Sequence, residues 1–320
     1  MLATRLEIPK GRVLMFKTTI VLVVALVPSI ASAQWYGSVD FMVPTRGATD
    51  ENVFQRNETE VLDAMGAGTG VFEVGTLSHL SLDLDFVASG RATAGFQADT
   101  FGVEGSYLVT DQWNAAASVS NASGLLASPF TVPGSIPNPL VDNNTFASVA
   151  YQSKLESAQL NLTYSYETQK GEGMWKFGVR TIRLDEEFQY SSTNAVMTNT
   201  LVSNTDNRII GPHVGFRGQT WAPGGAIALS VSGLLGYNDI DRMSVFNGAT
   251  TITNTDAASL VGDASIEYLL ALHPNVIARF GYQVLGLGSV GLAPNDPLIN
   301  NNQTEGVVYS MPYFGVVVIR

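Results

Sequence analysis

Long stretches in which apolar and polar residues alternate are the feature that most constrains the fold. In residues 80–97, leucines at every second position share one face, while Asp83 and Asp85 fall on the other. Residues 225–240 and 275–288 repeat the pattern, and helical spacing is almost absent. A period of two predicts β-strands with one apolar and one polar face. Residues 80–97 exceed the roughly five or six residues of a common globular strand, but suit a tilted strand that crosses a bilayer.

The first 33 residues are predicted to be a secretory signal peptide. Basic residues precede a short apolar run at 20–27, and Ala31-Ser32-Ala33 supplies the small residues of a cleavage site. The alternative, an anchoring helix, is disfavoured because a span needs about 20 apolar residues. We therefore expect export, cleavage after Ala33 and one domain over residues 34–320, with the start at either Met1 or Met15 left open.

Composition excludes several classes of function. The chain has 17 Lys and Arg against 28 Asp and Glu, and its net charge of −11 argues against a nucleic-acid partner. It has no Cys, which excludes disulfide scaffolds, thiolate metal sites and Cys nucleophiles. Because 45% of residues are hydrophobic and no later segment resembles a transmembrane helix, we expect an all-β protein of the outer membrane.

The predicted fold is a single transmembrane antiparallel up-and-down β-barrel of about ten strands. These are expected at 35–43, 80–97, 100–110, 145–168, 174–190, 207–219, 225–240, 257–271, 275–288 and 305–319. Long connections, at 44–79, 111–144, 191–206, 241–256 and 289–304, alternate with short ones. Outer-membrane barrels show this alternation because their external loops are long and their periplasmic turns short. Twelve strands is the alternative, if 44–79 or 111–144 contains a hairpin.

Two of the predicted strands change the side of their apolar residues partway along. In 145–168 the apolar face shifts from Val149 and Tyr151 to Leu160 and Leu162, and 174–190 shows a similar shift. A β-bulge would produce such a shift. So would a strand that leaves the membrane, where the outer face no longer meets lipid. The sequence leaves both explanations open.

If the apolar face meets lipid, the other face lines the barrel interior. The charged residues predicted to line it are Asp40, Asp83, Asp85, Arg91, Glu104, Arg180, His213, Arg217, Asp263, Glu267 and Arg279. A three-residue turn at 272–274 would place Glu267 directly across from Arg279. A polar interior in which charges pair with one another is favoured over a selectivity device, because buried charges need partners.

Several segments together resemble a family of β-barrel porins that is expanded in planctomycete-type bacteria. The matching segments are 86–96 (FVASGRATAGF), 101–108 (FGVEGSYL), 154–163 (KLESAQLNLT), 175–190 (WKFGVRTIRLDEEFQY), 207–216 and 277–294 (IARFGYQVLGLGSVGLAP). The resemblance implies an outer-membrane barrel and suggests pore formation, but supplies no functional residue. Gln159 departs from it, where an acidic residue is expected. So does the end of the chain at Arg320, where such barrels commonly carry an aromatic residue.

Two functions remain open. The first is a narrow, porin-like channel for small solutes or ions; the second is a non-conducting surface barrel with a structural role or a partner bound by its loops. About eight strands leave room for little but side chains, whereas 16 to 18 leave an aqueous channel, so ten strands imply a narrow pore. His79 near Asp83, and Asp239 with Asp241, form no catalytic pattern, so no enzyme, cofactor or metal is expected. The expected partners are outer-membrane lipid, the barrel-assembly machinery and small solutes.

Overall fold

The computed structural model describes residues 34–47, 86–120, 144–293 and 304–320, which form twelve β-strands in one antiparallel sheet. The strands are β1 (Gln34–Met42), β2 (Thr45–Gly47), β3 (Ser89–Ala98), β4 (Phe101–Thr110), β5 (Trp113–Ser120), β6 (Phe146–Thr168), β7 (Gly171–Thr193), β8 (Thr198–Ala222), β9 (Gly225–Phe246), β10 (Ala249–His273), β11 (Val276–Gly291) and β12 (Thr304–Ile319). Within these ranges no helix is long and apolar enough to cross a membrane.

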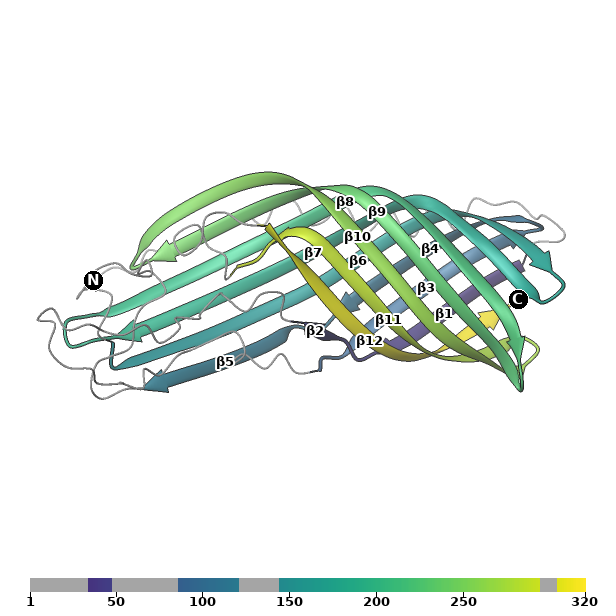
Figure 1. The fold of residues 1–320 in the computed structure, drawn as a ribbon, viewed down its shortest axis with the longest axis horizontal. Helices are drawn as coiled ribbons and strands as arrows, with labels where there is room; N and C mark the ends of the chain where they lie inside the picture. The colour runs from purple at the N-terminus through teal and green to yellow at the C-terminus, as the bar shows by residue number, and fades with distance from the viewer. Residues whose placement is uncertain (1–33, 48–85, 121–143, 294–303) are drawn as a thin grey trace, which may run out of the picture.

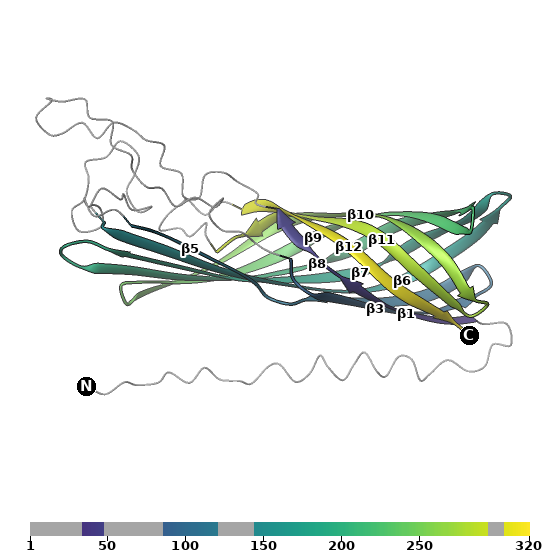
Figure 2. The ribbon, with the colours of Figure 1, turned by 90° about the horizontal axis from the view of Figure 1, so that it is seen from below.

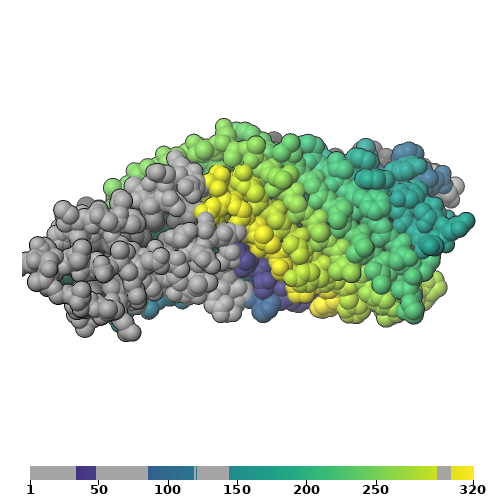
Figure 3. All heavy atoms as spheres, in the orientation of Figure 1, coloured from purple at the N-terminus to yellow at the C-terminus, as the bar shows by residue number. Residues whose placement is uncertain are grey.

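The sheet closes into a barrel because β1 pairs with β12 as well as with β3 (Figures 1 and 2). β2 continues the line of β1 against β12, and β5 continues the line of β4 against β6. The remaining strands follow chain order around the ring, so the barrel wall has ten strand positions. The predicted up-and-down barrel is confirmed. Figure 3 shows the closed side of the wall, where β12 (yellow) lies against the purple N-terminal segment that contains β1 and β2.

Two of the predicted long loops, 191–206 and 241–256, are wrong, and the predicted loop 111–144 is wrong in part because it contains β5. β7 ends at Thr193 and β8 begins at Thr198, while Asn247 and Gly248 alone join β9 to β10. Both turn residues have positive φ, 47° and 87°, which is the conformation of a tight hairpin and one that Gly and Asn tolerate best. The segments 198–206 and 241–246 are rich in Asn, Thr and Ser, which resembles loop composition, yet they are fully paired with their neighbours.

The outer wall carries an apolar band where the strands alternate as predicted. Its most exposed members include Val39, Phe41, Val103, Leu160, Leu162, Phe177, Val179, Leu229, Val231, Ile266, Phe280 and Val316. Aromatic residues lie at its edge near the short turns, with Trp35 against Phe96 and Trp175 against Phe216 at ring-centroid distances of 5.0 and 4.9 Å. Such a band with an aromatic border is the surface that a barrel presents to a bilayer.

The change of apolar face in β6 and β7 is not caused by a bulge. Their pairing is continuous from Phe146 with Thr193 to Thr168 with Gly171. Leu160 is 56% exposed on the outer wall, whereas Tyr151 is 3% exposed inside. Beyond the apolar band the outer face is polar, and the interior holds buried apolar side chains such as Tyr151 and Phe188 together with buried polar ones. The second explanation, strands that leave the membrane, accounts for the shift.

The central strands extend well past the closed ring. β6 to β10 have 22 to 25 residues each, whereas β11 and β12 have 16. β10 pairs with β9 from Ala249 onward but with β11 only from Val261 onward. The wall is therefore an open curved sheet at this end, which we call the extended sheet (Figure 2). The predicted strand at 80–97 begins only at Ser89, and its residues 80–85 lie outside the described ranges.

Candidate functional site

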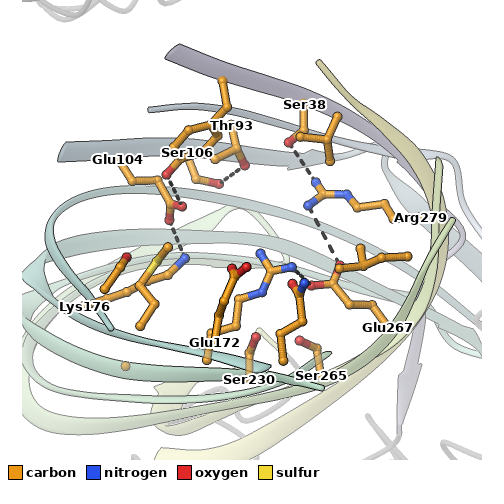
Figure 4. A pocket seen from close by; sticks show the side chains of 18 of the residues that line it. Ser38, Thr93, Glu104, Ser106, Glu172, Lys176, Ser230, Ser265, Glu267 and Arg279 are labelled. Atoms are coloured by element: carbon orange, nitrogen blue, oxygen red, sulfur yellow. Dashed lines mark hydrogen bonds and ion pairs between the residues drawn. The ribbon is translucent and has the colours of Figure 1, made fainter. Parts of the chain in front are cut away.

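The barrel interior inside the apolar band contains a polar chamber of about 1060 Å³. It is lined from nearly all strands of the ring and extends to Glu167, Glu172 and Gln219 at the rim formed by the short turns. Gln34 and Ile319, close to the ends of the described chain, line the same rim. The chamber therefore opens toward this end of the barrel. Figure 4 shows side chains from different strands converging on its interior.

Asp40 on β1 is the centre of the largest group of charges in the chamber. Its carboxylate is 1% exposed and accepts hydrogen bonds from Arg91 Nε at 2.7 Å and from Arg279 Nε and Nη2, both at 2.5 Å. Arg279 Nη2 also donates to Ser38 Oγ at 2.8 Å. Glu267 lies 2.8 Å from Arg217 and 4.0 Å from Arg279. In this network the Asp40 carboxylate pairs with the guanidinium groups of Arg91 and Arg279. The Glu267 carboxylate lies within ion-pair distance of Arg217 and Arg279.

A second group joins β1, β4 and β7. Glu104 lies 2.6 Å from Lys176 Nζ and also accepts a hydrogen bond of 2.9 Å from the Tyr36 hydroxyl. The side chains of Glu104 and Lys176 are 6% and 18% exposed. Because this carboxylate has both a cationic and a neutral donor, its burial is fully compensated.

The third group lies on the opposite wall. Arg180 Nη1 is 3.3 Å from Asp263 Oδ2, which also accepts a 2.6 Å hydrogen bond from Gln283 Nε2. His213 Nδ1 lies 3.0 Å from Asn161 Oδ1, and because that oxygen can only accept, Nδ1 carries the hydrogen. His213 is 3% exposed, and its Nε2 has no hydrogen-bond partner among the described residues.

An apolar layer closes the chamber on the side toward the extended sheet. Its buried side chains come from ten strands and from one residue that follows β11: Met42, Leu108, Trp113, Leu155, Ile182, Leu184, Ile209, Leu234, Val261, Leu285, Leu287, Val290, Leu292, Val307, Tyr309, Met311 and Tyr313. Trp113, Leu155 and Leu285 are 0% exposed. A water-filled passage would leave the side chains around it accessible, so the interior is packed shut at this level.

Residues 288–293 turn into the barrel, contribute Val290 and Leu292 to the apolar layer and continue the closure toward the extended sheet. We call them the inward segment. Asn207 binds the backbone of Gly291 through both amide atoms, each at 2.7 Å, and Asn238 Nδ2 donates to the Ser289 carbonyl at 3.0 Å. Ala293 N donates to Glu186 at 2.9 Å, on the carboxylate that also pairs with Arg46 at 2.7 Å. The inward segment is thereby held by polar side chains of β7, β8 and β9.

The structure places the predicted interior residues as follows. Asp40, Arg91, Glu104, Arg180, His213, Arg217, Asp263, Glu267 and Arg279 all lie on the inner face, around the chamber. Asp83 and Asp85 lie outside the described residues, as does the predicted signal peptide at 1–33. The expected cross-strand partner of Glu267 is wrong: Glu267 is opposite Gly281, because β10 continues to His273, the turn consists of Pro274 and Asn275, and a register irregularity lies between Ala271 and His273.

Sequence reasoning missed several charged residues of the interior, among them Lys176, Arg46, Glu186 and Arg242. Lys176 lies on the inner face of β7, between the outward Trp175 and Phe177, so parity alone could have identified it. Arg46 and Glu186 form a buried ion pair above the apolar layer, with side-chain exposures of 5% and 0%. Arg46 carried no such signal, because the predicted first strand ended at residue 43.

Within its described ranges, the structure does not assemble a catalytic or metal-binding site from the remaining residues that were considered for one. Asp239 and Asp241 lie on the outer, polar face of β9, and His79 is outside the described residues. Among the residues that the structure describes, no group of three or more His, Asp or Glu is arranged to hold a metal ion.

No protein-family model and no curated protein matches the sequence. Among solved structures, the chain is similar to the outer membrane protease OmpT from Escherichia coli, with a TM-score of 0.53 and 9% identity over 92% of this chain and 99% of that chain. The translocator domain of the autotransporter NalP from Neisseria meningitidis scores 0.35, with 11% identity over 93% and 92% of the two chains. A major outer membrane protein from Thermus thermophilus scores 0.34, with 11% identity over 89% and 99%. The likeness to OmpT shows the fold, and the chain has the β-barrel fold of bacterial outer-membrane proteins.

Proposed function

We propose that this protein is a non-conducting barrel of the outer membrane that carries an extended β-sheet beyond the bilayer. The apolar band with its aromatic border supports the membrane location. Outer-membrane lipid would then surround this band. The signal-peptide pattern at 1–33 supports export, and the barrel-assembly machinery would insert it. The outer face of the extended sheet is polar, as expected for a part that stands in water.

The apolar layer is the observation that carries this proposal. Ions and small solutes would have to pass side chains such as Trp113 and Leu155, which are fully excluded from solvent. Moving a charge through such a layer without hydrogen-bonding partners costs many kcal/mol. The inward segment is part of this obstacle and extends it toward the extended sheet. The charges of the chamber below are paired with one another, which supports a structural role for most of them.

The alternative is a narrow channel for small solutes, which the resemblance to β-barrel porins supports. It requires that the apolar layer and the inward segment move aside. Conductance of the mature chain, folded in detergent and inserted in a planar bilayer, decides between the two. We expect no current steps from protein that migrates as a folded barrel in an unheated gel. Stable, reproducible steps would refute the closed barrel and favour the channel.

Variants can show which side chains close the barrel interior to ions. The triple substitution Trp113→Ala, Leu155→Ala, Leu234→Ala removes bulk from three strands of the apolar layer. We expect it to produce current steps that the parent lacks. Leu229→Ala, on the outer wall of the same strand as Leu234, is the matched control and should stay silent. A folded triple variant that remains silent would assign the seal to the inward segment instead.

A further inference from the structure

The part of β10 that belongs to the extended sheet has a partner strand on one side only. β10 pairs with β9 from Ala249 onward, but β11 joins it only from Val261 onward (Figure 1). Phe246 and Ala249 flank the hairpin turn and pair with each other, so the even-numbered residues that follow direct their N–H and C=O away from β9. Within 249–258 no residue is buried, which leaves this edge in contact with water.

This free edge lacks the features that usually prevent a sheet from adding a further strand. Natural edge strands are very short, or they carry Pro, Lys or a bulge. Residues 249–258 (ATTITNTDAA) contain neither Pro nor Lys, and their pairing with β9 is continuous. Their Thr and Ile residues favour the extended backbone of a strand. Ile252, which is 71% exposed, also offers an apolar side chain on the outer face. The free edge is therefore suited to pair with one more strand.

The charges beside the free edge favour a cationic partner. Asp256 of β10 lies directly opposite Asp239 of β9, on the outer face of the sheet. Like charges directly opposite each other on neighbouring strands are destabilising. Arg208 is opposite Asp239 on its other side, but it is paired with Asp206 at 2.6 Å. Among the described residues, neither Asp239 nor Asp256 has an ion pair, so a basic residue placed opposite Asp256 would supply the missing counter-charge.

From these features we infer that the free edge of β10 binds an extended, basic polypeptide segment as an additional strand. Backbone hydrogen bonds supply the affinity in such strand addition, and side chains at alternate positions supply the selectivity. The pattern that fits has a basic residue opposite Asp256 and an apolar residue, four positions away, opposite Ile252. A second copy of this chain fits poorly, because it would bring its own Asp239 and Asp256 to the joint. The partner is therefore a different chain, in the water beyond the bilayer.

Fluorescence anisotropy of a labelled peptide, TTRTTTVTT, with the mature barrel in detergent tests this inference. When the peptide pairs antiparallel with β10, its Arg lies opposite Asp256 and its Val opposite Ile252. We expect saturable binding that is at least tenfold tighter than that of TTETTTVTT, in which the charge is reversed. In this register the N–H groups of the third, fifth and seventh peptide residues face β10. Methylating these nitrogens should abolish binding, whereas methylating the fourth and sixth should not.

Variants of the barrel make the complementary test. Asn254→Pro removes an N–H group from the free edge and keeps the pairing with β9, because an edge strand tolerates proline where its nitrogen faces the open side. We expect it to weaken peptide binding at least tenfold, whereas Asn254→Thr should bind as the parent does. Asp256→Asn should weaken binding at least fivefold. Glu187→Gln, which makes the same change of charge on the outer face of β7, is the matched control and should have no effect.

The inference is overturned if TTRTTTVTT gives no saturable signal with folded barrel, if TTETTTVTT binds equally well, or if folded Asn254→Pro binds like the parent. If Asn254→Pro does not fold, the N-methylated peptides decide, and equal binding by both would overturn the inference. Sedimentation in detergent addresses the other occupant: a parent dimer that Asn254→Pro converts to a monomer would assign the free edge to a second copy and also overturn the inference. None of these outcomes depends on conductance, so this inference and the closed-barrel proposal fail separately.

Discussion

Neutralising Asp40 is expected to destabilise the barrel more than removing either of the cations beside it. Asp40→Asn would leave Arg91 and Arg279 buried beside each other, with Glu267 at 4.0 Å from Arg279 as the nearest remaining carboxylate. Removing one partner of a buried ion pair costs roughly 3–5 kcal/mol. Because the Arg91 side chain is 17% exposed and water offsets part of this cost, we expect a loss of about 3 kcal/mol in the free energy of unfolding.

Urea unfolding of the barrel in lipid vesicles, followed by tryptophan fluorescence, measures this loss. Arg279→Gln should cost less, about 1–2 kcal/mol, because Asp40 keeps Arg91 as its partner. Asp206→Asn is the control: it breaks ion pairs with half-exposed arginines on the outer face, which should be worth less than about 1 kcal/mol. If Asp40→Asn costs no more than Asp206→Asn, the shared-carboxylate network does not stabilise the barrel and the reasoning fails.

Three further predictions concern the band, the apolar layer and the outer face of the extended sheet. Leu229→Arg, in the apolar band, should cost about 2–4 kcal/mol, whereas Asp239→Arg, beyond the band on the same strand, should change little; equal effects on urea unfolding would contradict the position of the band. Leu155→Ala should cost about 2–5 kcal/mol because the side chain is 0% exposed, and a loss below about 1 kcal/mol would show that the apolar layer is loosely packed. Burial, and then repulsion from Asp206, raises the pKa of Asp185 from 3.8 to about 6. Since the folded state holds this proton more tightly than the unfolded chain, the contribution of Asp185 to stability is present at low pH and lost as the pH rises through 3.8 to about 6. Asp185→Asn should remove that pH dependence from the unfolding midpoint between pH 4 and pH 7, and an unchanged slope would refute the assignment.

The course of most strands followed from the sequence because alternation is a local property. A residue such as Leu229 is outward in any barrel that places Ser230 inward, whatever strand lies next to it. The same parity assigned Asp40, Arg180 and Glu267 to the inner face. It failed where both faces of a strand are polar, as in 198–206, because composition there matches that of a loop.

Only the tertiary structure decided which residues lie opposite one another across the barrel interior. Alternation states which side of a strand a residue faces, but not which residue lies opposite or how much space separates them. Asp40 meets Arg279, which is 239 positions away in the chain, only because β1 closes the ring against β12. Likewise, leucines of many strands form a closed layer instead of lining a pore because ten strand positions bring the walls close enough for side chains to touch. The sequence by itself determined a barrel wall with an outer and an inner face, whereas closure of the ring determined that its interior is a chamber with one open end.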